Sequence, residues 1–153
     1  MWPRIVFVLC VSLLLASSLT SAADALLLEQ LKQDVAIQIA EVSPNVGSDQ
    51  RQSAVDAIVA DVSHTCPGAF TLDPRQTEAL RAGQCPFSDD QLMQKYSQLK
   101  QLAGGKPMPM LVEFYRKRFE RGELTPVQKT LYFTLTSAIG DNTQRALGSQ
   151  KKS

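Results

Sequence analysis

The sequence is poor in the residues that build metal centres and most catalytic sites. Its 153 residues include one histidine, His64, and three cysteines, none of which belongs to a Cys-x-x-Cys pair. A structural zinc ion takes four nitrogen or sulfur ligands, and no calcium loop of the form D-x-[DN]-x-[DN]-G occurs. The sequence therefore predicts no metal, no cofactor and no serine–histidine catalytic pair.

An excess of charge of either sign is also missing. The chain has 16 lysine and arginine residues against 15 aspartate and glutamate residues. Loss of an N-terminal leader that contains Arg4 and no acid would leave the two signs equal. Such a balance argues against nucleic acid and against an anionic membrane surface as the main partner.

Long apolar runs are absent outside the first residues of the chain. There, Arg4 precedes an apolar run of about a dozen residues, followed by small residues near Ala22. This order is typical of a secretory signal peptide, and the run is shorter than the roughly 20 residues that span a bilayer. We predict that residues 1–23 are a cleaved signal peptide and that the protein is periplasmic or secreted, with no stable membrane anchor. A lipoprotein cleaved at Cys10 is the lesser alternative, because Leu9 is bulky for such a site.

Two cysteines remain after the leader, and each precedes a proline: Cys66-Pro67 and Cys85-Pro86. An even number of cysteines in an exported chain predicts a disulfide. A bridge from Cys66 to Cys85 would close about 20 residues and stabilise the fold by roughly 3 kcal/mol. The alternative is a pair of free thiols used for metal or redox chemistry.

The remaining chain shows the three- and four-residue apolar spacing of helices. Capping boxes are predicted where Ser88 and Thr125 precede a glutamine by three residues. Another helix starts at Ser48 or Asp49, with Gln52 completing a capping box if Asp49 caps, and Asp73-Pro74 marks a further helix start. We predict an all-α, compact single-domain bundle of about five to six helices with one disulfide-closed loop. The helical domain would cover residues 24–147, followed by a flexible tail at 148–153.

Two enzymatic alternatives deserve comparison with this structural interpretation. His64 lies two residues from Cys66, as in a thiol–imidazole nucleophile, but a disulfide would consume that thiol. Asp89, Asp90 and Glu113 could form a carboxylate pair of the kind that hydrolases use. Acids at such positions are more often helix caps and solvated faces, so the sequence predicts no enzyme and no catalytic residue.

The segment FYRKRFERG, residues 114–122, interleaves aromatic and basic side chains after a methionine-containing linker. It could dock on an acidic protein or on phospholipid head groups, or it could be an amphipathic helix with a solvated basic side. Methionine suits adaptable binding surfaces. The predicted partner-binding residues are Met108, Met110, Tyr115, Arg116, Lys117, Arg118 and Arg121.

One short motif resembles that of a known family. LTPVQ at residues 124–128 is similar to the L-T-x-x-Q motif of the Spy/CpxP periplasmic chaperones. That family carries the motif twice and this chain carries it once, where a capping box accounts for it. The residues Thr65-Cys66…Phe70 with a second cysteine are similar to the acid-stress chaperone HdeA, but the cysteine spacing here is much shorter. We assign no family on these grounds.

The function predicted from the sequence is protein binding by an exported, non-enzymatic helical protein. An immunity or inhibitor protein, an envelope chaperone and a secretion-system assembly factor all fit this description. The alternatives are a small exported hydrolase that uses carboxylates and a binder of lipid or another apolar ligand. The identity of the partner and the existence of a homodimer are left open.

Overall fold

In the computed structural model, which describes residues 24–151, every regular element is a helix. The predicted signal peptide lies outside these residues. Between residues 24 and 151, no helix is long and apolar enough to cross a bilayer. The elements are a helix over residues 24–42, α2 (Ser48–Thr65), the 3-10 helix η1 (Pro67–Phe70), α3 (Pro74–Arg81), α4 (Asp89–Ala103), α5 (Met110–Glu120) and α6 (Pro126–Lys151).

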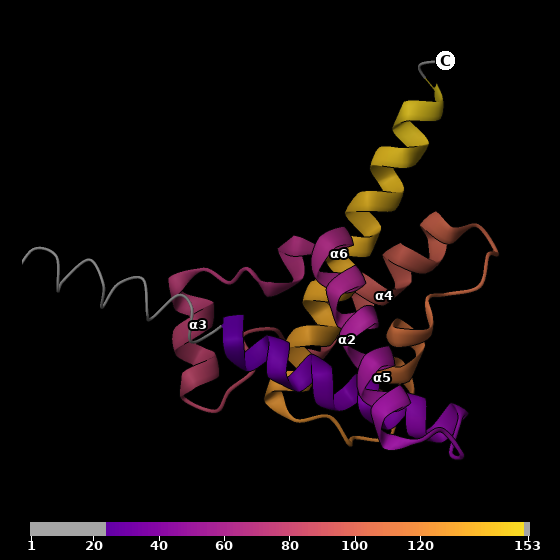
Figure 1. The fold of residues 1–153 in the computed structure, drawn as a ribbon. Helices are drawn as coiled ribbons and strands as arrows, with labels where there is room; N and C mark the ends of the chain where they lie inside the picture. Colours follow the sequence, from indigo (N-terminus) through magenta and orange to yellow (C-terminus); the bar gives the residue numbers. More distant parts are fainter. Residues whose placement is uncertain (1–23, 152–153) are drawn as a thin grey trace, which may run out of the picture.

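The last helix, α6, is the element around which the others pack. It contacts α4, η1 and α5, and Figure 1 shows it running through the middle of the bundle with its C-terminal part projecting beyond it. Leu131, Tyr132 and Leu135 form its buried face and are at most 2% exposed. The helical-bundle part of the predicted fold is therefore confirmed.

Most of the predicted helix starts are confirmed because they depend on contacts within four residues. Asp73 and Ser88 form complete capping boxes at α3 and α4. At α6, Thr125 Oγ1 accepts from the Gln128 backbone N–H at 3.2 Å, while Gln128 Oε1 accepts from the Thr125 N–H at 3.0 Å. Of the two starts expected for the next helix, Ser48 is confirmed, because α2 begins there. The capping box that Asp49 would have formed is absent, since the N-cap is Gly47, which makes no side-chain bond.

The predicted disulfide between Cys66 and Cys85 is also wrong, because both cysteines are free. Cys66 Sγ lies 3.8 Å from Nδ2 of Asn142, and Cys85 Sγ lies 3.7 Å from Oγ1 of Thr130. These two α6 residues are twelve positions apart, or about 18 Å along the helix axis. A disulfide requires Cα atoms within about 7 Å. The loop between the cysteines is thus laid along α6 instead of being closed on itself.

A buried carboxyl group joins three helices at the centre of the bundle. Asp34, which is 0% exposed, accepts hydrogen bonds from Tyr115 Oη at 2.7 Å, Gln128 Nε2 at 2.8 Å and Gln30 Nε2 at 3.1 Å. A buried polar group without such partners would cost several kcal/mol. The network therefore connects the helix over residues 24–42 to α5 and α6.

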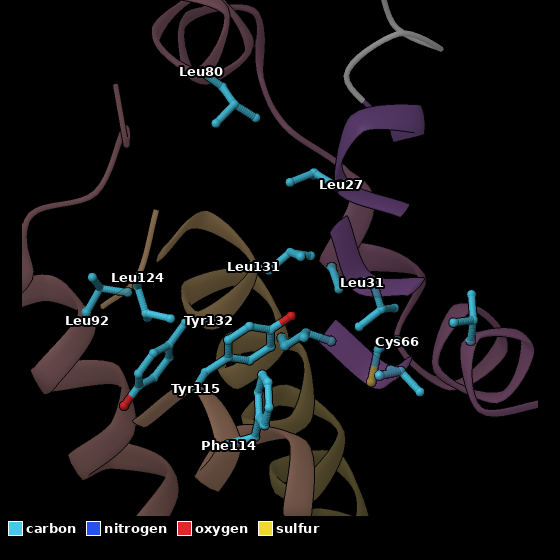
Figure 2. Close-up of a cluster of buried hydrophobic side chains, with 14 of the residues drawn as sticks. Leu27, Leu31, Cys66, Leu80, Leu92, Phe114, Tyr115, Leu124, Leu131 and Tyr132 are labelled. Atoms are coloured by element: carbon cyan, nitrogen blue, oxygen red, sulfur yellow. The ribbon is translucent and has the colours of Figure 1, made fainter. Parts of the chain in front are cut away.

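The apolar core surrounds this network. Tyr115, Phe114 and Tyr132 lie together beside Leu131, and Cys66 lies on the side of Leu31 (Figure 2). Phe114 meets Tyr115 edge-to-face at 5.4 Å between ring centroids. Edge-to-face and offset packing are the preferred aromatic geometries, so the rings fix how α5 sits against α6.

We expect Cys66 and Cys85 to carry free thiols in the folded protein. Alkylation of the denatured protein without reductant, followed by peptide mass spectrometry, should modify both residues. In the native state Cys66 should react slowly, because it is buried and because burial, with a smaller effect of Asp61, raises the pKa of its thiol. Recovery of a cross-linked Cys66–Cys85 peptide would contradict the structure.

The substitution Tyr115→Phe should lower the free energy of unfolding by about 1–3 kcal/mol, because it removes a hydrogen bond from a buried carboxyl group. Urea denaturation measures this change. Tyr132→Phe is the matched control, since Tyr132 is 2% exposed but donates no hydrogen bond within residues 24–151. Equal destabilisation by the two substitutions would show that the Asp34 network contributes nothing beyond packing.

Candidate partner-binding groove

The predicted binding segment forms helix α5, which follows the stretch from Lys106 to Pro109. Glu113 lies in its first turn and Lys117 and Arg118 in its last, as the helix dipole favours. The helix ends before Gly122, whose φ of +70° belongs to the left-handed region that glycine adopts readily. The chain therefore turns sharply after the basic residues and leaves them at a helix end.

The structure divides the seven predicted binding residues into three kinds. Tyr115 is 0% exposed and belongs to the core. Arg116 and Arg118 are half-buried and engaged in ion pairs within the protein. The remaining four are accessible at the surface to different degrees, with Met110 64% exposed; they are Met108, Met110, Lys117 and Arg121.

Five of the seven predicted binding residues line one groove between α5 and the C-terminal end of the helix over residues 24–42. We call it the α5 groove; its volume is about 280 Å³. The opposite wall consists of Gln38, Glu41 and Val42, and Val42 is 64% exposed. From the segment at residues 108–121, the groove takes Met108, Met110, Glu113, Phe114, Lys117, Arg118 and Arg121.

An ion pair holds the two walls together. Arg118 donates to Glu41 at 2.7 Å, and its guanidinium lies 3.7 Å from the ring centroid of Phe114. Exposed ion pairs stabilise by about 0–1 kcal/mol, and a cation over an aromatic ring adds an attraction of similar size. These contacts fix the orientation of Arg118 and give the groove a defined shape before anything binds.

A second charge network stabilises α5 against α4. Tyr96 Oη donates to Glu113 Oε1 at 2.8 Å, while Arg116 pairs with both Glu113 and Glu120 at 2.7 Å. The Arg116 guanidinium is the main cause that lowers the pKa of Glu113. Glu113 therefore stays ionised near neutral pH and is already engaged by an arginine, which does not suit a general acid.

The cations on the rim of the α5 groove are only partly neutralised. Lys117 is exposed and makes no ion pair within the described part of the chain. Arg121 lies 3.7 Å from Glu123, and both side chains are more than half exposed. The groove thus combines accessible methionine and valine side chains with lysine and arginine charges that remain available to an incoming carboxylate.

The structure does not bring the carboxylates of the hydrolase alternative together. Asp89 bonds to Lys129 at 3.0 Å on one side of α4, and Asp90 is exposed. Glu113 contacts Tyr96, which lies seven residues further along α4 than Asp89, or about 10 Å along the axis. These acids face different partners and share no contact.

The thiol–imidazole alternative gains no support either. His64 is exposed at the end of α2, whereas Cys66 is buried with a raised thiol pKa. An activated cysteine has a lowered pKa. No group of three histidine, cysteine or acidic residues that could hold a metal ion occurs between residues 24 and 151.

Comparison with protein-family models, with curated proteins and with solved structures gave no match to this chain.

The sequence does not indicate the wall formed by Gln38, Glu41 and Val42. These residues end an ordinary amphipathic helix, and Arg118 follows Glu41 by 77 positions. One feature of the sequence hints at an exposed surface on that helix: its apolar face is unusually wide, because Leu26 and Ile37 extend it sideways. These two side chains are 43% and 44% exposed in the structure.

Alkaline titration should unfold the protein as its buried tyrosines ionise. Burial raises the pKa of all three tyrosines, Tyr96, Tyr115 and Tyr132, above the usual value of about 10. Stability that depends on these phenols is fully present below about pH 10 and falls as the pH rises further. Phenolate absorbance should therefore appear together with loss of helical circular dichroism. Tyrosine ionisation that is complete while the helices remain intact would contradict the burial of these side chains.

Proposed function

We propose that this protein is exported and acts by binding another protein at the α5 groove. The observation that carries the proposal is the meeting, from two separate helices, of exposed Met110 and Val42 with Lys117, Arg118 and Arg121. Apolar anchors surrounded by charged groups are characteristic of protein interfaces. The balanced charge of the whole chain favours a protein partner over nucleic acid.

The chemistry of the groove describes the segment it would accept. Methionine side chains adapt to different apolar shapes, so one apolar side chain of the partner fits between Met110 and Val42. A carboxylate beside that side chain would meet Lys117 or Arg121. The expected partner segment is therefore an acidic stretch with an apolar anchor, presented as a helix or an extended strand.

The groove needs little rearrangement to receive such a segment. Arg118 is already oriented by Glu41 and by Phe114, and Phe114 is buried. Preformed sites lose less conformational entropy on binding than flexible ones. This property fits an immunity or inhibitor protein, an envelope chaperone or an assembly factor, and these differ in how many partners they bind.

A pull-down of the tagged protein from the envelope and secreted fractions of its host, read by mass spectrometry, would distinguish them. One stoichiometric partner indicates an immunity, inhibitor or assembly protein, and many weakly bound clients indicate a chaperone. Size-exclusion chromatography tests whether a second copy of the chain occupies the groove instead. Failure to capture any protein would contradict the proposal.

Once a partner has been identified, two variants test the groove: Met110→Asp, and the double substitution Lys117→Glu with Arg121→Glu. Each should weaken binding of the partner at least tenfold, or about 1.4 kcal/mol. The melting temperature should change little, because these side chains are exposed. Met93→Asp and Lys100→Glu are matched controls on α4, where Met93 is 57% exposed. Equal losses of binding in the controls would remove the groove assignment.

Arg116 and Arg118 are poorer positions for this test. Their ion pairs with Glu113 and Glu41 are internal to the protein, so alanine at either position would disturb α5 as well as the surface. Reversing only Lys117 and Arg121 keeps a loss of binding separate from a loss of structure.

A further inference from the structure

A second pocket shares no residue with the α5 groove. It has a volume of about 270 Å³ and is lined by residues of the end of α2, η1, the α3 region and the middle of α6. Pockets for drug-sized ligands measure roughly 300–1,000 Å³. This pocket therefore suits a smaller molecule, about the size of an amino acid or a dipeptide.

Two opposite charges at this pocket have no ion-pair partner within the described residues. Asp141 and Arg145 both line it, are both exposed, and occupy positions one turn apart on α6. Side chains four positions apart on a helix are close enough to pair. Within residues 24–151, however, neither side chain forms an ion pair. Each charge is thus available to a ligand.

Hydroxyl residues of α6 add to the polar lining of the pocket. Thr134 and Ser137 both line it, and Thr134 Oγ1 donates to the Leu131 carbonyl at 3.3 Å. Ser137 Oγ is buried and, like Thr136 Oγ1 on the same helix, has no hydrogen-bond partner within the described residues. Ser137 therefore forms part of the wall behind the two charges.

Asn142 adds an acceptor on the same side. Its Nδ2 donates to the Thr65 carbonyl at 2.9 Å at the end of α2. The Oδ1 atom of its side-chain amide is an acceptor. Asn142 follows Asp141 in the sequence, and both residues line the pocket. The carboxyl end of α2 adds a partial negative charge nearby. This part of the pocket favours an ammonium group, whereas the Arg145 guanidinium favours a carboxylate.

The lining also contains apolar groups among polar ones such as Thr71 and Gln76. Phe87 stacks on Phe133 with 3.7 Å between ring centroids, and Pro67 and Ala138 line the pocket as well. An aliphatic side chain of a ligand would lose its contact with water there.

We propose that this pocket binds a small zwitterion with an apolar side chain, either a free amino acid or a short peptide. Asp141 and Asn142 take the ammonium group, and Arg145 takes the carboxylate. The inference is independent of the α5 groove, because the two sites share no residue.

Isothermal titration calorimetry with L-leucine and with leucyl-leucine tests the proposal and distinguishes the two sources of this chemistry. Leucine amide keeps only the ammonium group and N-acetyl-leucine keeps only the carboxylate. We expect each of these two analogues to bind at least tenfold more weakly than whichever of leucine and leucyl-leucine binds more tightly. Equal affinities for all four probes, or no binding of any probe at millimolar concentration, would overturn the proposal.

Substitutions at Arg145 and Asp141 test which charged group of the ligand each residue binds. Arg145→Gln should weaken binding of the zwitterion at least tenfold and leave the affinity for leucine amide unchanged. Asp141→Asn should weaken the zwitterion equally and leave the affinity for N-acetyl-leucine unchanged. Lys100→Gln and Asp90→Asn, both exposed on α4, are matched controls that should bind normally. Unchanged zwitterion affinity in either pocket variant would overturn the assignment.

Discussion

The burial of the Asp34 carboxyl group is the constraint on which the arrangement of this protein depends. It can be tolerated only if hydrogen-bond donors from other helices converge on it, and Tyr115 of α5 and Gln128 of α6 supply them. Gln128 has two roles, because its Oε1 accepts from the Thr125 N–H in the capping box while its Nε2 reaches Asp34. The start of α6 and the position of the helix over residues 24–42 are thereby coupled through one side chain.

Helix α5 connects this interior to the surface. Tyr115 and Phe114 face inward, whereas Lys117 and Met110 are exposed on the same two to three turns. Rigid packing of the aromatic residues therefore fixes where the exposed residues lie, and the Arg118–Glu41 ion pair fixes the opposite wall. A binding surface built on a packed helix is better preorganised than one on a loop.

Local features of the fold could be predicted from the sequence, and distant ones could not. The capping boxes of α3, α4 and α6 involve residues three positions apart, so their chemistry is visible in the chain itself. The role of Asp34 depends on partners 81 and 94 positions away. The prediction of a disulfide was wrong for the same reason, because the number and spacing of cysteines contain no information on where η1 packs along α6. Half of the α5 groove is contiguous in sequence and was predicted; the wall at Glu41 was not.

The packing of the other helices on α6 has a consequence for the cooperativity of folding. Leu131, Tyr132 and Leu135 complete the core, and the donor Gln128 comes from the same helix. Without α6, Asp34 would lose one of its three hydrogen-bond donors, and α4, α5 and η1 would lose the surface on which they pack. Contacts between residues far apart in sequence carry a loop-closure cost that only the completed core offsets. The bundle should therefore fold as one cooperative unit, with no stable partial core that omits α6.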